Sequence, residues 1–145
     1  MKKILLIVFL AAAIGTQAQI RSIPAVTTEA FKAKYPNATN VSWKDNMFAV
    51  TAAFEQGGTR YKATYNNKGE WQKTQHSIKQ SDLPAAVTDG LKKSKYADWK
   101  MGDVTLLELP GDKTQYVVNV VKSDLNKKNL LFSSEGQLLK DSITL

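Results

Sequence analysis

One short phrase occurs twice in this chain. YNNKGEWQK spans residues 65–73, and FSSEGQLLK spans residues 132–140. Each copy has an aromatic residue, two small polar residues, a charged residue, a glycine and then a large apolar residue. Gly69 and Gly136 can adopt the left-handed conformation that closes a short hairpin loop, and the Asn and Ser pairs can bond the local backbone of a turn. The phrase therefore predicts two β-hairpin tips.

A second phrase is repeated upstream of each tip. SIPAVTTEAFKAKYP starts at Ser22, and DLPAAVTDGLKKSKYADW starts at Asp82. Both predict an amphipathic helix with proline in its first turn, and Ser22 or Asp82 stands where an N-cap residue would. The predicted buried stripes are residues 23, 26, 30 and 31 in the first helix and residues 83, 86, 87, 90 and 91 in the second.

Alternating apolar and polar residues follow each predicted helix. They predict strands over residues 41–43, 48–55, 60–65 and 70–76, and later over 102–104, 105–109, 115–122, 129–132 and 137–143. We therefore expect an α+β fold of two tandem repeats, residues 22–78 and 81–145. Each repeat would be one helix followed by a four-stranded antiparallel β-meander, with the helices packed on one face of the sheets.

The N-terminal residues have the pattern of an export signal. Lys2 and Lys3 precede an apolar run over residues 4–14, which is too short for a membrane span. We expect a signal peptide over residues 1–18, cleaved after Ala18, which leaves residues 19–145 as one domain. The chain has no cysteine, so it has neither the residue that carries a lipid anchor nor a disulfide. The prediction is a periplasmic or secreted protein without a membrane anchor.

The charge of the chain and its lack of typical catalytic and metal-binding patterns argue against several classes of function. The net charge of +7 includes Lys2 and Lys3, which leaves +5, and the remaining basic residues are scattered with only two arginines in the chain. That pattern does not predict a nucleic-acid partner. His76 is the one histidine, and no calcium-loop or phosphate-loop pattern is present. We expect no catalytic residue, no metal site and no cofactor, and hence a protein that is not an enzyme.

The face of each sheet left free by the helices is the predicted binding surface. The aromatic-rich side of each strand, including Phe48 and Phe54, should face a helix. The opposite side should be open, and Trp71 follows a hairpin tip where a tryptophan can be exposed. The candidate binding residues are Thr51, Lys62, Thr64, Trp71, Gln72, Thr74 and Asn119.

These residues carry a resemblance to a known family. The chain resembles the PepSY-like family of small exported bacterial proteins in five motifs. They are IPAV from Ile23, YPNA from Tyr35, VSW from Val41, Y-x-x-x-G-x-W from Tyr65 and LP at residues 83–84. The family architecture is similar to that of the β-lactamase inhibitor protein. Ala97 and Leu138 depart from the family pattern, and the inhibitor protein has disulfides that this chain lacks. The resemblance therefore implies the fold, but not the inhibition of β-lactamase.

The predicted function is an exported, non-enzymatic binding module whose partner is an unknown exported protein or a small ligand. Inhibition of a periplasmic or extracellular enzyme is one form that this function can take. The alternative is a small-molecule or cell-envelope sensor with a ligand cleft between the two repeats, near residues 76–81. The tripeptide at residues 141–143, Asp-Ser-Ile, also resembles an O-glycan acceptor motif of exported bacterial proteins.

Overall fold

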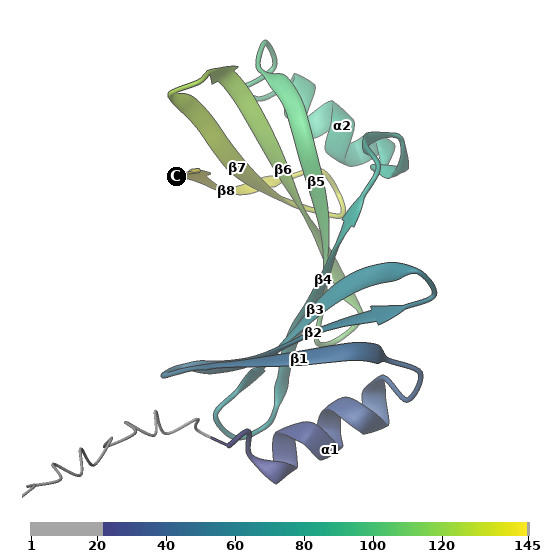
Figure 1. Cartoon of the computed structure of the whole chain (residues 1–145). Helices are drawn as coiled ribbons and strands as arrows, with labels where there is room; N and C mark the ends of the chain where they lie inside the picture. The colour runs from purple at the N-terminus through teal and green to yellow at the C-terminus, as the bar shows by residue number, and fades with distance from the viewer. Residues whose placement is uncertain (1–21, 145) are drawn as a thin grey trace, which may run out of the picture.

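A computed structural model describes residues 22–144 of the chain. They form one antiparallel sheet of eight strands in chain order, together with two short α-helices (Figure 1). The predicted signal peptide lies outside the described residues. The elements, in order, are α1 (Ala25–Lys34), β1 (Thr39–Asn46), β2 (Ala49–Gln56), β3 (Thr59–Asn66), β4 (Trp71–Ile78), the 3₁₀ turn η1 (Gln80–Asp82), α2 (Ala85–Lys92), β5 (Lys100–Leu109), β6 (Lys113–Ser123), β7 (Asn126–Ser133) and β8 (Leu138–Ile143).

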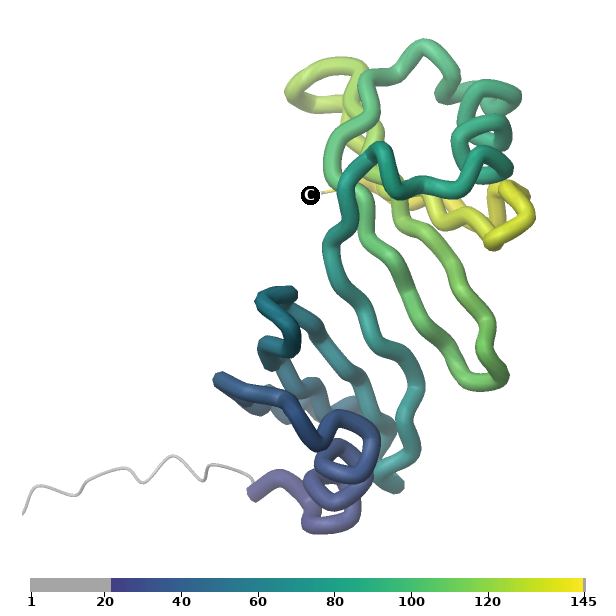
Figure 2. Tube along the Cα trace, turned by 90° about the vertical axis from the view of Figure 1, so that its right-hand side faces the viewer, coloured from purple at the N-terminus to yellow at the C-terminus, as the bar shows by residue number. Residues whose placement is uncertain are grey.

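The fold class predicted from the sequence is wrong. The described residues are mostly β, and they form a single eight-stranded sheet rather than two helix-plus-four-strand repeats. The reason is the pairing of β4 with β5, in which Gln75 faces Leu107 and Ile78 faces Val104, so that the backbone hydrogen bonds continue across the middle of the molecule. β4, in teal, runs between the lower and upper parts of the trace in Figure 2. The helices have only 10 and 8 residues, and each covers a small part of the sheet.

The repeated glycine phrase forms two hairpin tips, as predicted. Gly69 has φ of 79° between β3 and β4, and Gly136 has φ of 84° between β7 and β8. The amide of Gly69 donates to the carbonyl of Asn66 at 3.0 Å, and the amide of Gly136 donates to the carbonyl of Ser133 at 3.0 Å. These positive φ angles explain why glycine occupies both positions.

The two helices begin at their prolines rather than at the predicted caps. Pro24 and Pro84 are the N-cap residues, and no side chain caps either helix, so the predicted capping roles of Ser22 and Asp82 are wrong. The predicted stripe of α1 is also rotated, because Thr27 is fully buried while Val26 is 53% exposed.

The sheet and the helices enclose two clusters of buried side chains, one under each helix. Phe48, which was predicted to be buried, is 81% exposed because it lies in the turn before β2 rather than in the strand. The cluster under α1 contains Phe31, Ala52, Phe54, Ala63 and Tyr65, and the cluster under α2 contains Leu83, Val87, Leu91, Tyr96, Val104, Tyr116, Val118, Val120, Leu130 and Phe132.

Both helices cover the same face of the sheet. Ala63, in the cluster under α1, is paired with Thr74 of β4. Val104, in the cluster under α2, is paired with Ile78 of the same strand. Thr74 and Ile78 are an even number of residues apart along a strand whose pairing with β5 is regular, so their side chains point to the same side. The opposite face of all eight strands is therefore covered by neither helix (Figure 1).

Candidate functional site

We call the face opposite α1 and α2 the open face. Strand pairing decides which residues lie on it, because directly paired residues point to the same side of an antiparallel sheet. One row crosses the middle of the molecule from Ala53 of β2 through Lys62, Gln75 and Leu107 to Gln115 of β6. The open face is thus continuous from one half of the sheet to the other.

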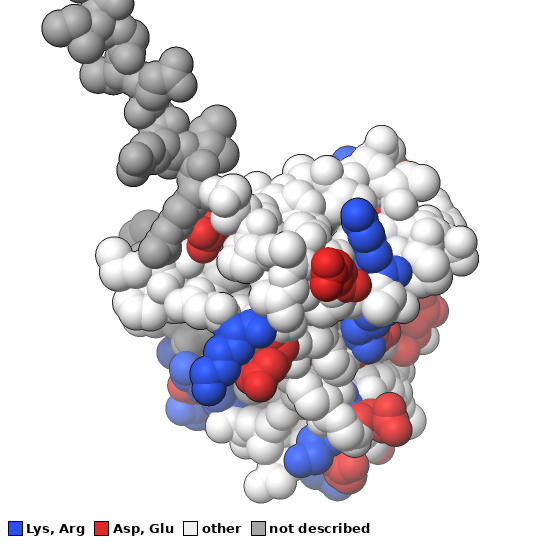
Figure 3. Space-filling model, turned by 90° about the horizontal axis from the view of Figure 1, so that it is seen from below, with Lys and Arg blue, Asp and Glu red and all other residues white. Residues whose placement is uncertain are grey.

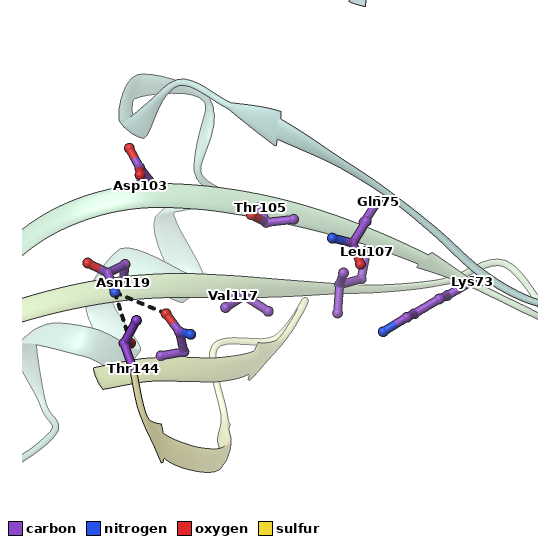
Figure 4. A pocket seen from close by; sticks show the side chains of 9 residues that line it. Lys73, Gln75, Asp103, Thr105, Leu107, Val117, Asn119 and Thr144 are labelled. Carbon is purple, nitrogen blue, oxygen red and sulfur yellow. Dashed lines mark hydrogen bonds between the residues drawn. The ribbon is translucent and has the colours of Figure 1, made fainter. Parts of the chain in front are cut away.

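A shallow hollow of about 380 Å³ lies on the open face beside β4 (Figure 4). Its apolar floor is formed by Leu107, which is only 8% exposed, and by the half-buried Val117. Lys73 and Asp103 lie toward opposite ends of the hollow in Figure 4. The full lining is Lys73, Gln75, Asp103, Thr105, Leu107, Val117, Asn119, Asn129 and Thr144.

Asn119 is fixed at one end of this hollow by three hydrogen bonds. Its Nδ2 donates to Oδ1 of Asn129 at 3.0 Å, to Oγ1 of Thr144 at 3.2 Å and to the carbonyl of Lys128 at 3.3 Å. The amide therefore ties β6 to β7 and to the residue that follows β8. This gives the hollow a preorganised polar edge.

The structure places three other predicted binding residues on the open face. Thr51 and Thr64 are directly paired between β2 and β3, and Lys62 is paired with Gln75 of β4. These three residues lie on the half of the sheet that adjoins the hollow, and Asn119 lies in the hollow itself. The assignment of all four to binding stays a prediction.

Two predicted binding residues lie on the helix side instead. Thr74 is fully buried, and its hydroxyl is hydrogen bonded to the hydroxyl of Tyr35 and accepts a hydrogen bond from Nε1 of Trp71 at 2.9 Å. Trp71 packs against the cluster under α1, and the ammonium of Lys34 lies 3.8 Å from its ring centroid. The placement of Thr74 and Trp71 on an open surface is therefore wrong.

The register of β3 and β4 explains this correction. Thr64 is paired with Lys73 and Lys62 is paired with Gln75, so the odd-numbered residues of β4 from Lys73 onward point to the open face, whereas Trp71, before the register shift, is paired with Tyr65 and points to the helix side. Gln72 is exposed, and it is the extra residue of a bulge that separates the Thr64 pair from the Tyr65 pair. Four residues that line the hollow were not predicted as binding residues, because only the pairing of the strands reveals their place. They are Lys73, Gln75, Thr105 and Leu107.

The histidine of the chain lies on the helix side of β4. The ring of His76 is 4.8 Å from that of Tyr61, and its Nδ1 is buried without a hydrogen-bond partner. No group of three His, Cys, Asp or Glu residues that could hold a metal ion occurs within residues 22–144. The same residues contain no helix that is long and apolar enough to cross a membrane.

The perturbed pKa values belong to structural contacts outside the hollow. Burial raises the pKa of the Tyr35 hydroxyl, although its hydrogen bond to Thr74 acts in the opposite direction. Hydrogen bonds from Asn40 and Arg60 lower the pKa of the exposed Glu55 carboxyl. These shifts follow from burial and from charge-assisted hydrogen bonds.

The fold and the hollow together define a small β-sheet protein with two helices on one face and an open, hollowed face on the other. A family model described as "Putative beta-lactamase-inhibitor-like, PepSY-like" matches residues 49–140, which is more than half of the chain. The chain belongs to this PepSY-like family, and the resemblance predicted from its sequence is confirmed.

Solved structures from several Bacteroides species share the fold. A BLIP-like protein from Bacteroides fragilis is 28% identical with a TM-score of 0.71, and the match covers 84% of this chain and 88% of that one. A DUF2874 family protein from Bacteroides ovatus is 26% identical with a TM-score of 0.75, covering 83% and 87% of the two chains. A protein from Bacteroides eggerthii described as a "putative periplasmic" protein is 24% identical with a TM-score of 0.74, covering 83% and 88%. No curated protein matches the chain.

Proposed function

We propose that this chain is an exported, non-enzymatic binding protein that captures a protein partner on its open face. The observation that carries the proposal is the uncovered side of the eight-stranded sheet, which has an apolar-floored hollow near its centre. A sheet face that neither helix covers leaves apolar side chains such as Val117 and Leu131 in contact with water. An apolar surface of this kind is stabilised when a partner covers it.

The relatives support an exported, inhibitor-like role. The family description refers to β-lactamase-inhibitor-like proteins, and one solved relative is described as BLIP-like. Another is described as periplasmic, and residues 1–18 of this chain have the pattern of a signal peptide. Inhibition of an exported enzyme would require only that the open face cover the enzyme's active site, with no catalytic group in the inhibitor.

Export is tested directly by fractionating cells that express the full chain. We expect the protein in the periplasmic or secreted fraction, with an intact mass that corresponds to a chain beginning at Gln19. Retention in the cytoplasm with residues 1–18 still attached would contradict the proposal.

Capture is tested with the chain from Gln19 as bait for periplasmic and secreted proteins. Thr105 is half-buried in the hollow, so Thr105→Trp fills the site with an uncharged ring. The matched control is Ala85→Trp, at an exposed position of α2 on the covered side. We expect the control to retain one stoichiometric protein and Thr105→Trp to lose it, while circular dichroism shows that both variants are folded. Equal capture by the two variants would refute binding through the open face.

A further inference from the structure

We propose that the open face recognises an acidic segment of its protein partner, with an apolar side chain of that segment seated in the hollow. This inference rests on the proposed function and adds the chemistry of the partner. It is carried by the distribution of charge between the two faces of the sheet and by the apolar residues at its centre.

The positive charge of the described chain is concentrated on the open face. Strand pairing and alternation place eight basic residues on this face and only two acidic ones, an excess of six positive charges. The basic residues are Lys44, Arg60, Lys62, Lys73, Lys100, Lys113, Lys127 and Lys140, and the acidic residues are Glu55 and Asp103.

The remaining surface of the described chain carries no such excess. The other described residues include nine basic and eleven acidic side chains. Figure 3 views the molecule from below, onto the side where α1 lies, and shows blue and red side chains next to one another. The rest of the described surface therefore has a mixed charge, and the electrostatic attraction of an acidic partner is directed to the open face.

Three lysines of the open face, on β1, β3 and β4, are available to a partner. Lys44 and Lys73 end a row of paired residues that passes through Thr51 and Thr64, and Lys62 lies in the adjacent row. The ion pairs within residues 22–144 are Arg60–Glu55, Lys95–Asp141 and Lys122–Asp98. None of these three lysines takes part in them, so their charge is not neutralised by an ion pair within the described chain.

Apolar residues of the open face lie on the next strands of the sheet, β5 to β7. Leu107 and Val117 form the floor of the hollow, and Leu131 is paired with Val117 on the neighbouring strand. The hollow of about 380 Å³ lies within the size range of sites that hold small ligands, so it has room for a large apolar side chain. A segment that carries Asp or Glu next to such a side chain would match the floor of the hollow and the lysines at its β4 side, where Lys73 lines the hollow and Lys62 is paired with Gln75, while Asp103 lies toward the other end.

Two other occupants fit these observations less well. A second copy would bring the same positive face against itself, and like charges oppose that arrangement. A flat anionic membrane would make poor contact, because the two parts of the sheet are steeply inclined to each other and the helices lie outside the angle (Figure 1). A protruding acidic protein segment satisfies both the charge and the shape.

The test uses two synthetic peptides that share a central phenylalanine. One carries two Glu and two Asp residues around it, and the other carries two Lys and two Arg residues. The ¹⁵N-labelled chain from Gln19 is titrated with each peptide, and amide shifts are followed by NMR at low and at physiological salt. We expect the acidic peptide to shift the amides of Thr105, Val117 and Asn129 in a salt-sensitive manner, whereas the basic peptide leaves them unchanged. Equal effects of both peptides, no effect of either, or shifts confined to α1 and α2 would overturn the proposal.

Charge reversal provides the matched variants. Lys62→Glu/Lys73→Glu reverses two charges on the open face, and Lys92→Glu/Lys93→Glu makes the same change in net charge at the end of α2. At low salt we expect the open-face variant to bind the acidic peptide on the order of tenfold more weakly, since each reversed charge acts across roughly 8 Å of largely aqueous surface. The α2 variant should bind within about twofold of the unmodified chain. An equal loss in both variants would overturn the role of the open-face lysines.

A titration with lipid vesicles distinguishes a protein partner from a lipid surface. Phosphatidylglycerol vesicles should bind the open face more weakly than the acidic peptide does, as judged from the concentration of each at which the amide signals of the open face change. Stronger binding to the vesicles would overturn the choice of a protein segment. The capture experiment distinguishes a failure of this inference from a failure of the proposed function. If Thr105→Trp loses the captured partner but Lys62→Glu/Lys73→Glu keeps it, the open face binds a partner of different chemistry. If both keep it, the binding face itself is wrong.

Discussion

The replacement Gly90→Ala tests whether the β7–β8 hairpin packs as tightly against α2 as the structure shows. Gly90 lies inside α2, where alanine normally stabilises a helix by about 1 kcal/mol relative to glycine. A methyl group at this position, however, would overlap the carbonyl oxygen of Gly136 at the hairpin tip. Helix propensity and tertiary packing therefore predict opposite signs for the change in the free energy of unfolding.

The magnitude follows from the kind of atom that the methyl group meets. A flexible side chain could move aside, but the carbonyl of Gly136 belongs to a closed turn whose amide is hydrogen bonded to Ser133. Overpacking of a tight contact costs about 1–3 kcal/mol, and we take the upper part of this range because backbone must move. After the gain of about 1 kcal/mol from propensity, we expect a net loss of about 1–2 kcal/mol.

Urea denaturation of the chain from Gln19, followed by tryptophan fluorescence and circular dichroism, measures this loss as a lower midpoint at constant slope. Gly136→Ala should lose more, about 3 kcal/mol, because its φ of 84° is unfavourable for alanine and its methyl group would overlap the carbonyl oxygen of Ala86. Gly58→Ala is the control for backbone strain alone, since its φ is 76° and nothing lies within 4 Å of the added atom; it should lose about 1 kcal/mol. A Gly90→Ala protein more stable than the unmodified chain would refute the tight contact.

Thr74, Asp141 and Phe48 offer further tests of the structure. Thr74→Val should lower the free energy of unfolding by about 1–3 kcal/mol, because it leaves two partly buried polar groups, the Tyr35 hydroxyl and Nε1 of Trp71, without their partner; chemical denaturation measures the loss, and partner capture should be unchanged. Hydrogen bonds from Tyr96 and Lys95 lower the pKa of Asp141, so its stabilising effect is complete above the unfolded-state pKa of about 4 and is lost as the pH falls through the lower folded-state value. Melting curves between pH 2 and pH 7 should therefore show a weaker acid dependence in Asp141→Asn. Phe48→Ser should change the free energy of unfolding by less than about 0.5 kcal/mol, since this side chain is 81% exposed, and a larger change in urea denaturation would contradict the exposed turn.

Local patterns predicted local structure well. The glycine phrase located both hairpin tips, and the proline phrases located both helices, although α2 ends at Lys92, seven residues before its phrase ends at Trp99. These features depend on the conformations of a few neighbouring residues, such as the positive φ of Gly69. The predicted division into residues 102–104 and 105–109 was a smaller error, because β5 is one strand with an irregularity between Met101 and Val104.

The fold class and part of the site could not be derived in this way. The contacts between β4 and β5 join residues about thirty positions apart, and no local pattern shows that two sheets meet edge to edge. The face of Thr74 depended on whether Lys73 or Gln72 is paired with Thr64, and a shift of one residue exchanges the two faces of a strand. The aromatic side chains around Thr74 also supply hydrogen bonds that allow a polar residue to be buried.

The distribution of charge shows why pairing matters for function. Along the sequence the lysines are scattered, and a net charge of this size is usual for a solvated surface. In the sheet, Lys44 of β1 and Lys73 of β4 lie in one row, and Lys62 of β3 lies in the next row on the same side. The intervening residues of these strands point to the other side, where Trp43, Ala63 and Thr74 contribute to the packing under α1. The alternation that buries the core therefore also gathers the basic side chains on the face that no helix covers, so that folding and the proposed recognition of an acidic partner depend on the same register.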